Sequence, residues 1–271
     1  MHYTDSGGTS TEALVLLHAG IFADWFVPLD EQPVLADVRR IQVIRTGYLN
    51  DPPATPMSIQ DHVRECADLL RALGVDRARL VAHSAGVVYA LQMALDYPDL
   101  VVDLVLGEPP LINPLMPVED HAAVGAVLGP VLGSAVQAAM RGDLPAAFET
   151  AMTGLCGPGY PDAITAALGP AGLRRARANC GYFFTGEIPA FNQWHFHEEL
   201  AQRIEQPVHL VGGGDSPPFT HNVISYLARI LPNADSTYLL GQNHLLPLTA
   251  PAELARLVAA HSTREPALRS A

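Results

Sequence analysis

The sequence predicts an α/β fold in which a mostly parallel β-sheet has helices on both faces and carries a long helical insertion. Short apolar segments alternate along the chain with segments whose apolar residues recur at helical spacing. Several of the short segments are apolar throughout, as strands are when helices cover both faces of a parallel sheet. The alternation stops in the middle of the chain, where Ala-, Gly- and Pro-rich helical sequence replaces it.

The first half of the chain contains the clearest alternation. Its predicted strands cover residues 14–18, 41–45, 78–83 and 101–106, and its predicted helices cover residues 58–73 and 85–96. The first of these helices has sequence signals at both ends. Ser58 can cap its N-terminus and Asp61 suits the positive end of the helix dipole, while Gly74 is typical of the residue after a helix.

The second half divides the chain into a core and an insertion. Its predicted elements are helices at residues 118–140, 144–152 and 164–180, a strand at 208–212, a helix at 222–231, a strand near Tyr238 and a helix at 252–261. We therefore predict a core α/β domain made of residues 1–109 and 206–262, with a helical insertion at residues 110–205. The polar residues 263–271 are predicted to form a flexible tail.

The composition argues against several classes of protein. The chain has 271 residues, 49% of them apolar and 16% charged, and its formal charge is −12. That charge disfavours a nucleic-acid partner or an anionic membrane surface, and no apolar run is expected to reach membrane-spanning length. Three widely spaced cysteines and the lack of a secretory signal predict a cytoplasmic protein without disulfides. A homodimer is compatible with the sequence.

Residues 82–86, Ala-His-Ser-Ala-Gly, lie between a predicted strand and a predicted helix. A strand, a sharp turn and a helix are the setting of a nucleophile elbow, in which a serine is held clear of the backbone. Ala82 and Gly86 are small, as the close approach of the strand and the helix requires. We therefore predict Ser84 as a nucleophile, and the alternative is that Ser84 only caps the helix.

The order of motifs resembles that of the α/β-hydrolase family, in particular its serine esterase- and lactonase-like members. An apolar run ends in His18-Ala19-Gly20, Ser84 follows, and Gly241-Gln242-Asn243-His244 comes after the last predicted strand. The resemblance covers nearly the whole chain and implies the α/β-hydrolase fold, with the insertion as a cap over the active site. It implies His244 as the general base and, later, as the acid that protonates the leaving group. It requires no cofactor.

Two carboxylates are rival candidates for the acid that orients His244. Asp215 follows the strand after the insertion, the commonest place in the family, but Asp-Ser-Pro after glycines is also ordinary turn sequence. Glu108 closes the strand before the insertion, where a carboxylate needs a partner to offset its burial. The arrangement at Glu108 resembles the fungal zearalenone lactonases, which have a Glu at this place. Both residues remain candidates, with a slight preference for Glu108.

The resemblance assigns the oxyanion hole to two backbone N–H groups, those of Ala85 and Gly20. His18 is expected to hold this loop by a hydrogen bond rather than to carry a proton. The predicted substrate-binding residues are Ala19, Ile21, Trp25, Trp194, Leu115 and Met116. For the aromatic residues among them, the alternative is simple packing between cap and core.

Two further groups of residues are predicted to be structural. His195 and His197 do not predict a metal site, because histidines two positions apart share a face only on a strand, and this segment is predicted to be a helix or loop. Arg45 begins the Arg-Thr-Gly-Tyr segment after the second strand, where Gly47 is expected to turn the chain.

The residues together predict a serine hydrolase that cleaves a hydrophobic carboxylic ester or lactone through an acyl-enzyme. The expected partner is therefore a small molecule. The same residues are compatible with non-ester chemistry, as in a C–C bond hydrolase, a lyase or a cyclase. The fold is also compatible with a non-catalytic ligand-binding protein.

Overall fold

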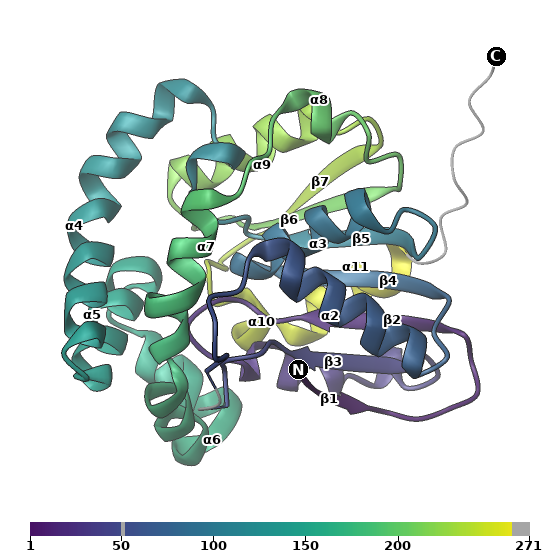
Figure 1. The fold of residues 1–271 in the computed structure, drawn as a ribbon, viewed down its shortest axis with the longest axis horizontal. Helices are drawn as coiled ribbons and strands as arrows, with labels where there is room; N and C mark the ends of the chain where they lie inside the picture. Colours follow the sequence, from purple (N-terminus) through teal and green to yellow (C-terminus); the bar gives the residue numbers. More distant parts are fainter. Residues whose placement is uncertain (50–51, 262–271) are drawn as a thin grey trace.

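The computed structural model describes residues 1–49 and 52–261, so the predicted tail at residues 263–271 lies outside the described residues. Within them, seven strands form one sheet in the order β1-β3-β2-β4-β5-β6-β7 (Figure 1). The strands are β1 (His2–Asp5), β2 (Glu12–Leu17), β3 (Arg40–Ile44), β4 (Arg77–His83), β5 (Val101–Gly107), β6 (Val208–Gly213) and β7 (Ala234–Leu239). Only β1 runs antiparallel to its neighbour within this sheet. The predicted fold class is confirmed.

The sequence analysis did not predict β1. This strand forms the edge of the sheet and pairs with β3 alone, and three of its four residues are exposed. An exposed edge strand has no buried face, so it lacks the apolar alternation by which strands are recognised.

Helices cover both faces of the sheet. One face packs against α2 (Ile59–Ala72), α3 (Ala85–Asp96) and α9 (Pro218–Ile230), and the other packs against α1 (Val27–Asp30), α10 (Leu246–Thr249) and α11 (Pro251–His261). The start of α2 has the predicted cap, because the Asp61 N–H donates to the Ser58 hydroxyl at 3.1 Å and the Ser58 N–H donates to the Asp61 carboxylate at 2.9 Å. Reciprocal bonds of this kind satisfy two backbone donors at a helix start.

The described segment between β5 and β6 contains helices and connecting loops but no strand, and it stands beside the sheet (Figure 1). It contains α4 (His121–Met140), α5 (Leu144–Cys156), α6 (Tyr160–Asn179), a π-helical turn at Phe183–Glu187, α7 (Ile188–Gln193) and α8 (Glu198–Ala201). Short 3-10 turns lie at Asp24–Phe26, Pro33–Leu35, Asn113–Leu115 and Val118–Asp120. We call residues 110–205 the cap and the rest of the described chain the core.

The outer helix of the cap corrects one sequence expectation. Val118–Met140 is long and apolar enough to cross a membrane by length and composition, whereas no run of that kind was expected. Its Ala- and Gly-rich sequence dilutes the apolar signal, and only 22% of its most apolar stretch is buried. In the folded chain, α4 packs mainly against α5.

Candidate active site

Ser84 lies on the turn between β4 and α3 in a backbone conformation that side chains rarely adopt. Its φ is 49° and its ψ is −122°, and the residue is half-buried. The turn brings the following helix against the end of β2. A Cβ at Gly86 would lie 2.2 Å from the carbonyl oxygen of Leu17, so glycine is required there. The packing of the helix against β2 therefore allows the serine to sit at the tip of the turn.

The structure brings Ser84, His244 and Glu108 into one line of hydrogen bonds. The Ser84 Oγ lies 3.1 Å from His244 Nε2, and His244 Nδ1 lies 3.2 Å from Glu108 Oε2. A carboxylate can only accept, so the proton of the imidazole lies on Nδ1 and leaves Nε2 to accept from the serine hydroxyl. This is the protonation state in which an imidazole can take the proton of a nucleophile.

Glu108 is fully buried and is held from three sides. It has a φ of 44° directly after β5, and its own N–H donates to the Val211 carbonyl on the neighbouring strand at 2.8 Å. Its Oε1 accepts from the Gly213 N–H at 2.6 Å and from the Ser216 hydroxyl at 2.9 Å, while Oε2 faces His244. These donors offset the cost of burying the carboxylate and fix its orientation.

The structure does not bring Asp215, the rival acid, to His244. Asp215 is exposed, and its backbone N–H donates to the Gln242 carbonyl at 2.8 Å. Strands β5 and β6 are neighbours, so both carboxylates follow the same edge of the sheet. Glu108 occupies the position beside His244, and its other carboxylate oxygen accepts from the Gly213 N–H, two residues before Asp215.

Two aromatic residues surround His244 on the core side. Trp25 presents its ring at a centroid distance of 6.1 Å, and His83 donates from Nε2 to the His244 carbonyl at 2.8 Å. Burial, followed by the nearby His244, holds the pKa of His83 well below its usual range. His83 therefore stays neutral and adds no positive charge beside His244.

The loop after β2 lies across a small recess from Ser84. Ala19, Gly20, Ile21 and Trp25 line this recess of about 20 Å³ together with Ser84 and His244. The Gly20 carbonyl accepts from Trp25 Nε1 at 2.9 Å, and Ile21 has a φ of 70°. Ala85 is the first residue of α3, and N–H groups in the first turn of a helix have no acceptor within it. The predicted oxyanion donors thus flank the serine.

A larger cavity opens on the other side of Ser84 and His244. Its volume is about 200 Å³, and its walls come from the segment after β5, from α4, α5 and α7, and from the π-helical turn. The lining is almost entirely apolar: Pro109, Pro110, Leu111, Ile112, Leu128, Leu132, Leu155, Phe183, Ile188, Phe191 and Pro217, with Asn192 and Thr220 as polar members.

Three predicted substrate-binding residues lie elsewhere. Trp194 donates from Nε1 to the Gln92 side chain of α3 at 2.8 Å and stacks on Phe196, so it packs the cap on the core. Leu115 and Met116 are buried in the hydrophobic core and do not line the cavity. Trp194 was predicted to line the pocket from its late position in the insertion, and that position does not determine which side chains it meets.

Sequence reasoning also missed two residues beside the site, Glu187 and Ser216. Ser216 donates to Glu108, and Glu187 is fully buried against Arg45. A carboxylate in an otherwise apolar helical stretch is the signal that could have indicated Glu187. Within residues 1–49 and 52–261, no three His, Cys, Asp or Glu side chains gather in a way that could hold a metal ion.

Comparisons with known proteins agree with the fold. A family model described as "Alpha/beta hydrolase family" matches residues 14–257. An enol-lactonase from Burkholderia xenovorans superposes with a TM-score of 0.74 at 16% identity, over 97% of this chain and 96% of that one. Carboxylesterase CesB from Bacillus subtilis gives 0.69 at 18% identity, over 97% and 87%. A carboxylesterase of the Thaumarchaeon Nitrososphaera gargenis gives 0.72 at 16% identity, over 96% and 92%. At such identities the likeness shows the fold alone.

Proposed function

Because this chain belongs to the alpha/beta hydrolase family, we propose that it is a serine hydrolase that cleaves a carboxylic ester or lactone through an acyl-enzyme. One observation carries the proposal. Ser84, His244 and the buried Glu108 form a continuous hydrogen-bonded line at the mouth of an apolar cavity. A line of this kind is what an activated serine nucleophile requires.

Each group in the line has a role in the proposed reaction. His244 takes the proton of Ser84 as the hydroxyl attacks the carbonyl carbon, and the N–H groups of Gly20 and Ala85 stabilise the oxyanion. His244 then protonates the leaving alcohol, and the acyl group stays on Ser84. Water, deprotonated by His244, releases the acid. Glu108 orients the imidazole and offsets the positive charge that forms on it.

The cavity supports a compact, hydrophobic substrate. Its volume of about 200 Å³ is below the roughly 300–1,000 Å³ of pockets for drug-sized ligands. Apart from the reacting groups, its polar lining is Asn192 and Thr220, so an acyl chain or lactone ring would be held mainly by burial of apolar surface. Ester hydrolase and lactonase neighbours in the comparisons are consistent with this substrate class.

A serine-reactive fluorophosphonate and a panel of 4-nitrophenyl esters and lactones test the proposal at neutral pH. We expect the probe to label wild-type protein on the peptide that contains Ser84, and the Ser84→Ala variant to lose both labelling and turnover. A wild-type protein that neither reacts with the probe nor hydrolyses any ester or lactone would contradict the proposal. Turnover of diketones by an ester-inert protein would instead favour C–C bond chemistry, and tight binding without turnover would favour a ligand-binding role.

A further inference from the structure

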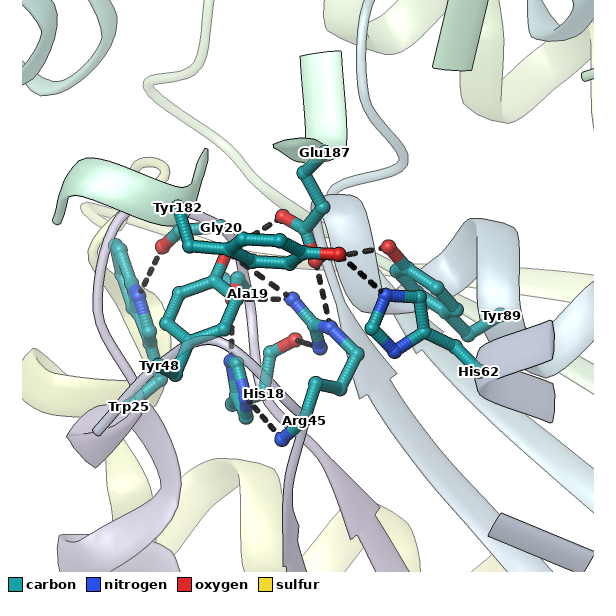
Figure 2. A network of polar contacts seen from close by, with 10 residues as sticks. All are labelled: His18, Ala19, Gly20, Trp25, Arg45, Tyr48, His62, Tyr89, Tyr182 and Glu187. Atoms are coloured by element: carbon teal, nitrogen blue, oxygen red, sulfur yellow. Dashed lines mark hydrogen bonds and ion pairs between the residues drawn. The ribbon is translucent and has the colours of Figure 1, made fainter. Parts of the chain in front are cut away.

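A buried ion pair joins the core to the cap directly behind the proposed oxyanion loop. Arg45, the first residue after β3, donates from Nε to Oε1 of Glu187 at 2.7 Å, although the two residues are 142 positions apart. The side chains are 2% and 0% exposed. Figure 2 shows Arg45 with Glu187 on one side and the backbone of His18 and Ala19 on the other. The pair is therefore also in contact with the loop that faces Ser84.

The guanidinium of Arg45 holds two carbonyl groups of that loop. Nη1 donates to the His18 carbonyl at 2.5 Å and Nη2 donates to the Ala19 carbonyl at 3.0 Å. The backbone N–H of Arg45 donates to His18 Nε2 at 3.2 Å, and so His18 Nδ1 carries the proton and donates to the Ala19 carbonyl at 2.6 Å. The Ala19 carbonyl thus accepts from two donors, one of which is cationic.

Because the peptide bond is planar, hydrogen bonds that fix the Ala19 carbonyl also fix the direction of the Gly20 N–H. The Ala19 carbonyl and the Gly20 N–H belong to one peptide unit, and no peptide bond in the described chain is cis. In a trans peptide the C=O and the N–H point in opposite directions. Fixing the Ala19 carbonyl toward Arg45 therefore fixes the Gly20 N–H away from Arg45. Gly20 lines the recess with Ser84, and Arg45 is not among the residues that line it.

Glu187 completes the hold on Arg45 from the cap. Its carboxylate accepts from the Tyr48 hydroxyl at 2.5 Å and from the Tyr89 hydroxyl at 2.9 Å, in addition to Arg45. The guanidinium carbon also lies 5.0 Å and 4.5 Å from the ring centres of the same two tyrosines. A buried cation surrounded in this way has one fixed geometry and depends on Glu187 for its compensating charge.

The π-helical turn of the cap carries a second contact to the loop. Phe183 begins this turn and Glu187 ends it, and a Cβ at Gly20 would lie 2.3 Å from the ring of Phe183. Phe183 also lines the substrate cavity. Phe183 of this turn therefore contacts both the substrate cavity and the loop, and Glu187 of the same turn contacts Arg45.

We propose that Arg45 and Glu187 are positioning residues, whose buried ion pair aims the Gly20 N–H at the oxyanion and makes the oxyanion hole dependent on the cap. This inference rests on the proposed function for its catalytic consequence. It assigns a role in catalysis to a cap residue that is expected to have no contact with the substrate.

Three variants separate positioning from simple attachment of the cap. Glu187→Gln keeps the shape of the side chain and removes the charge that compensates Arg45. The double variant Arg45→Met/Glu187→Leu replaces the pair by apolar groups, a change that often preserves stability at buried ion pairs. Asp30→Asn is the matched control: Asp30 pairs with Arg40 at the opposite end of β3, at 2.8 Å, and is not in contact with the loop.

We expect Glu187→Gln to lower kcat for a short activated ester by about 100-fold, with KM changed by less than about threefold, because a misaimed oxyanion donor weakens only the transition state. The double variant removes the uncompensated charge but leaves the His18 and Ala19 carbonyls without their cationic donor, so its kcat should stay low, and Asp30→Asn should keep the wild-type kcat. A double variant with wild-type stability and wild-type kcat would overturn the proposal. If Glu187→Gln does not fold, Tyr89→Phe removes a single hydrogen bond to Glu187 and should give a smaller fall in kcat with KM again unchanged.

Hydrogen–deuterium exchange distinguishes this inference from the proposed function. Backbone amides of residues 19–22 should exchange faster in Glu187→Gln than in wild type, and at the wild-type rate in Asp30→Asn, whether or not the protein hydrolyses esters. Unchanged exchange in that loop would contradict the positioning role. Failure of the wild type to react with the fluorophosphonate would count against the serine hydrolase alone.

Discussion

The core and the cap differ in where they place unusual backbone. Among the described residues, three side chains other than glycine have positive φ: Ile21, Ser84 and Glu108, which follow β2, β4 and β5. In the cap, the left-handed positions are all glycines, at residues 142, 157 and 169. The core therefore accepts strained backbone at residues in and beside the proposed active site, whereas the positive φ values of the cap fall on glycines.

This difference indicates a division of work between the two regions. Strained φ values persist only where surrounding structure holds them, and here the parallel strands provide that structure. The cap is mainly helical, with a kink in α6 at Gly169 and a π-helical turn at Phe183–Glu187, and it contributes most of the apolar cavity wall. We expect substitutions in the core, and at Glu187 where the cap holds the core loop, to change how fast any substrate reacts, and substitutions in the cap's cavity wall to change which substrate reacts. The predictions below test this division.

Substitution of the proposed base should have the largest effect. His244→Gln removes the acceptor for the Ser84 proton, and we expect kcat for every ester tested to fall by about 10⁶-fold. The measurement is kcat and KM across a series of acyl chain lengths. A loss confined to some chain lengths would break the division, because it would mean that a core residue selects the substrate.

Substitutions of the two candidate acids, Glu108 and Asp215, should differ in their effect on kcat, by a factor smaller than that of His244→Gln but still large. Glu108→Gln should lower kcat by about 10³- to 10⁴-fold, because the imidazole loses the group that fixes its tautomer and offsets its charge. The exposed Asp215→Asn should leave kcat within about threefold of wild type, as expected for a side chain outside the reacting line. Equal losses in the two variants would contradict the assignment of Glu108.

Acid should weaken the junction between core and cap. His62 on α2 contacts the Tyr182 hydroxyl of the cap at 2.8 Å, and burial, followed by the charge of Arg45, lowers the pKa of His62 to about 3. Below about pH 6.5 the unfolded chain binds a proton that the folded chain rejects, so stability falls as the pH falls, by roughly 2–3 kcal/mol at pH 4.5.

Denaturant unfolding between pH 7 and pH 4.5 measures this effect. His62→Gln should flatten the loss of unfolding free energy with acid, while the control His195→Gln, at an exposed histidine, should leave the slope unchanged. Equal slopes in wild type and His62→Gln would show that the junction is not the acid-sensitive point.

The smallest predicted effect concerns the shape of the cavity. Leu132 of α4 lines the cavity, whereas Val127 on the same helix is 60% exposed. Leu132→Ala should shift the preferred acyl chain by one or two carbons and change the ratio of kcat/KM between chain lengths by about tenfold. Val127→Ala should not change this ratio. An equal loss of kcat for all chain lengths in Leu132→Ala would show that the cavity wall of the cap acts on rate instead of selection.

Much of the core could be predicted from the sequence because local patterns determine it. The apolar strands, the Ser58 N-cap at the start of α2 and the elbow at Ser84 each depend on residues that are close in sequence. His244 could be proposed from its place after the last predicted strand. The structure places this histidine beside Ser84, although 160 positions separate the two residues.

Other features depend on contacts that no local pattern encodes. Glu108 and Asp215 both follow neighbouring strands, and only the backbone turn at each residue decides which carboxylate reaches His244. The pairing of Arg45 with Glu187 depends on how the cap folds back over the loop after β2. Trp194 was predicted to bind substrate, but it packs against Gln92 of the core instead, because position along the insertion does not tell which partner a side chain will meet.

The buried pair at Arg45 limits how this molecule can be rebuilt. A helical insertion such as the cap could be exchanged between related proteins as a self-contained module. A transplanted cap without an acid at the place of Glu187 would leave the buried Arg45 guanidinium without a compensating charge, which would lower the free energy of unfolding by about 3–5 kcal/mol. A chimera must therefore inherit both partners together if it is to keep the geometry of the loop after β2.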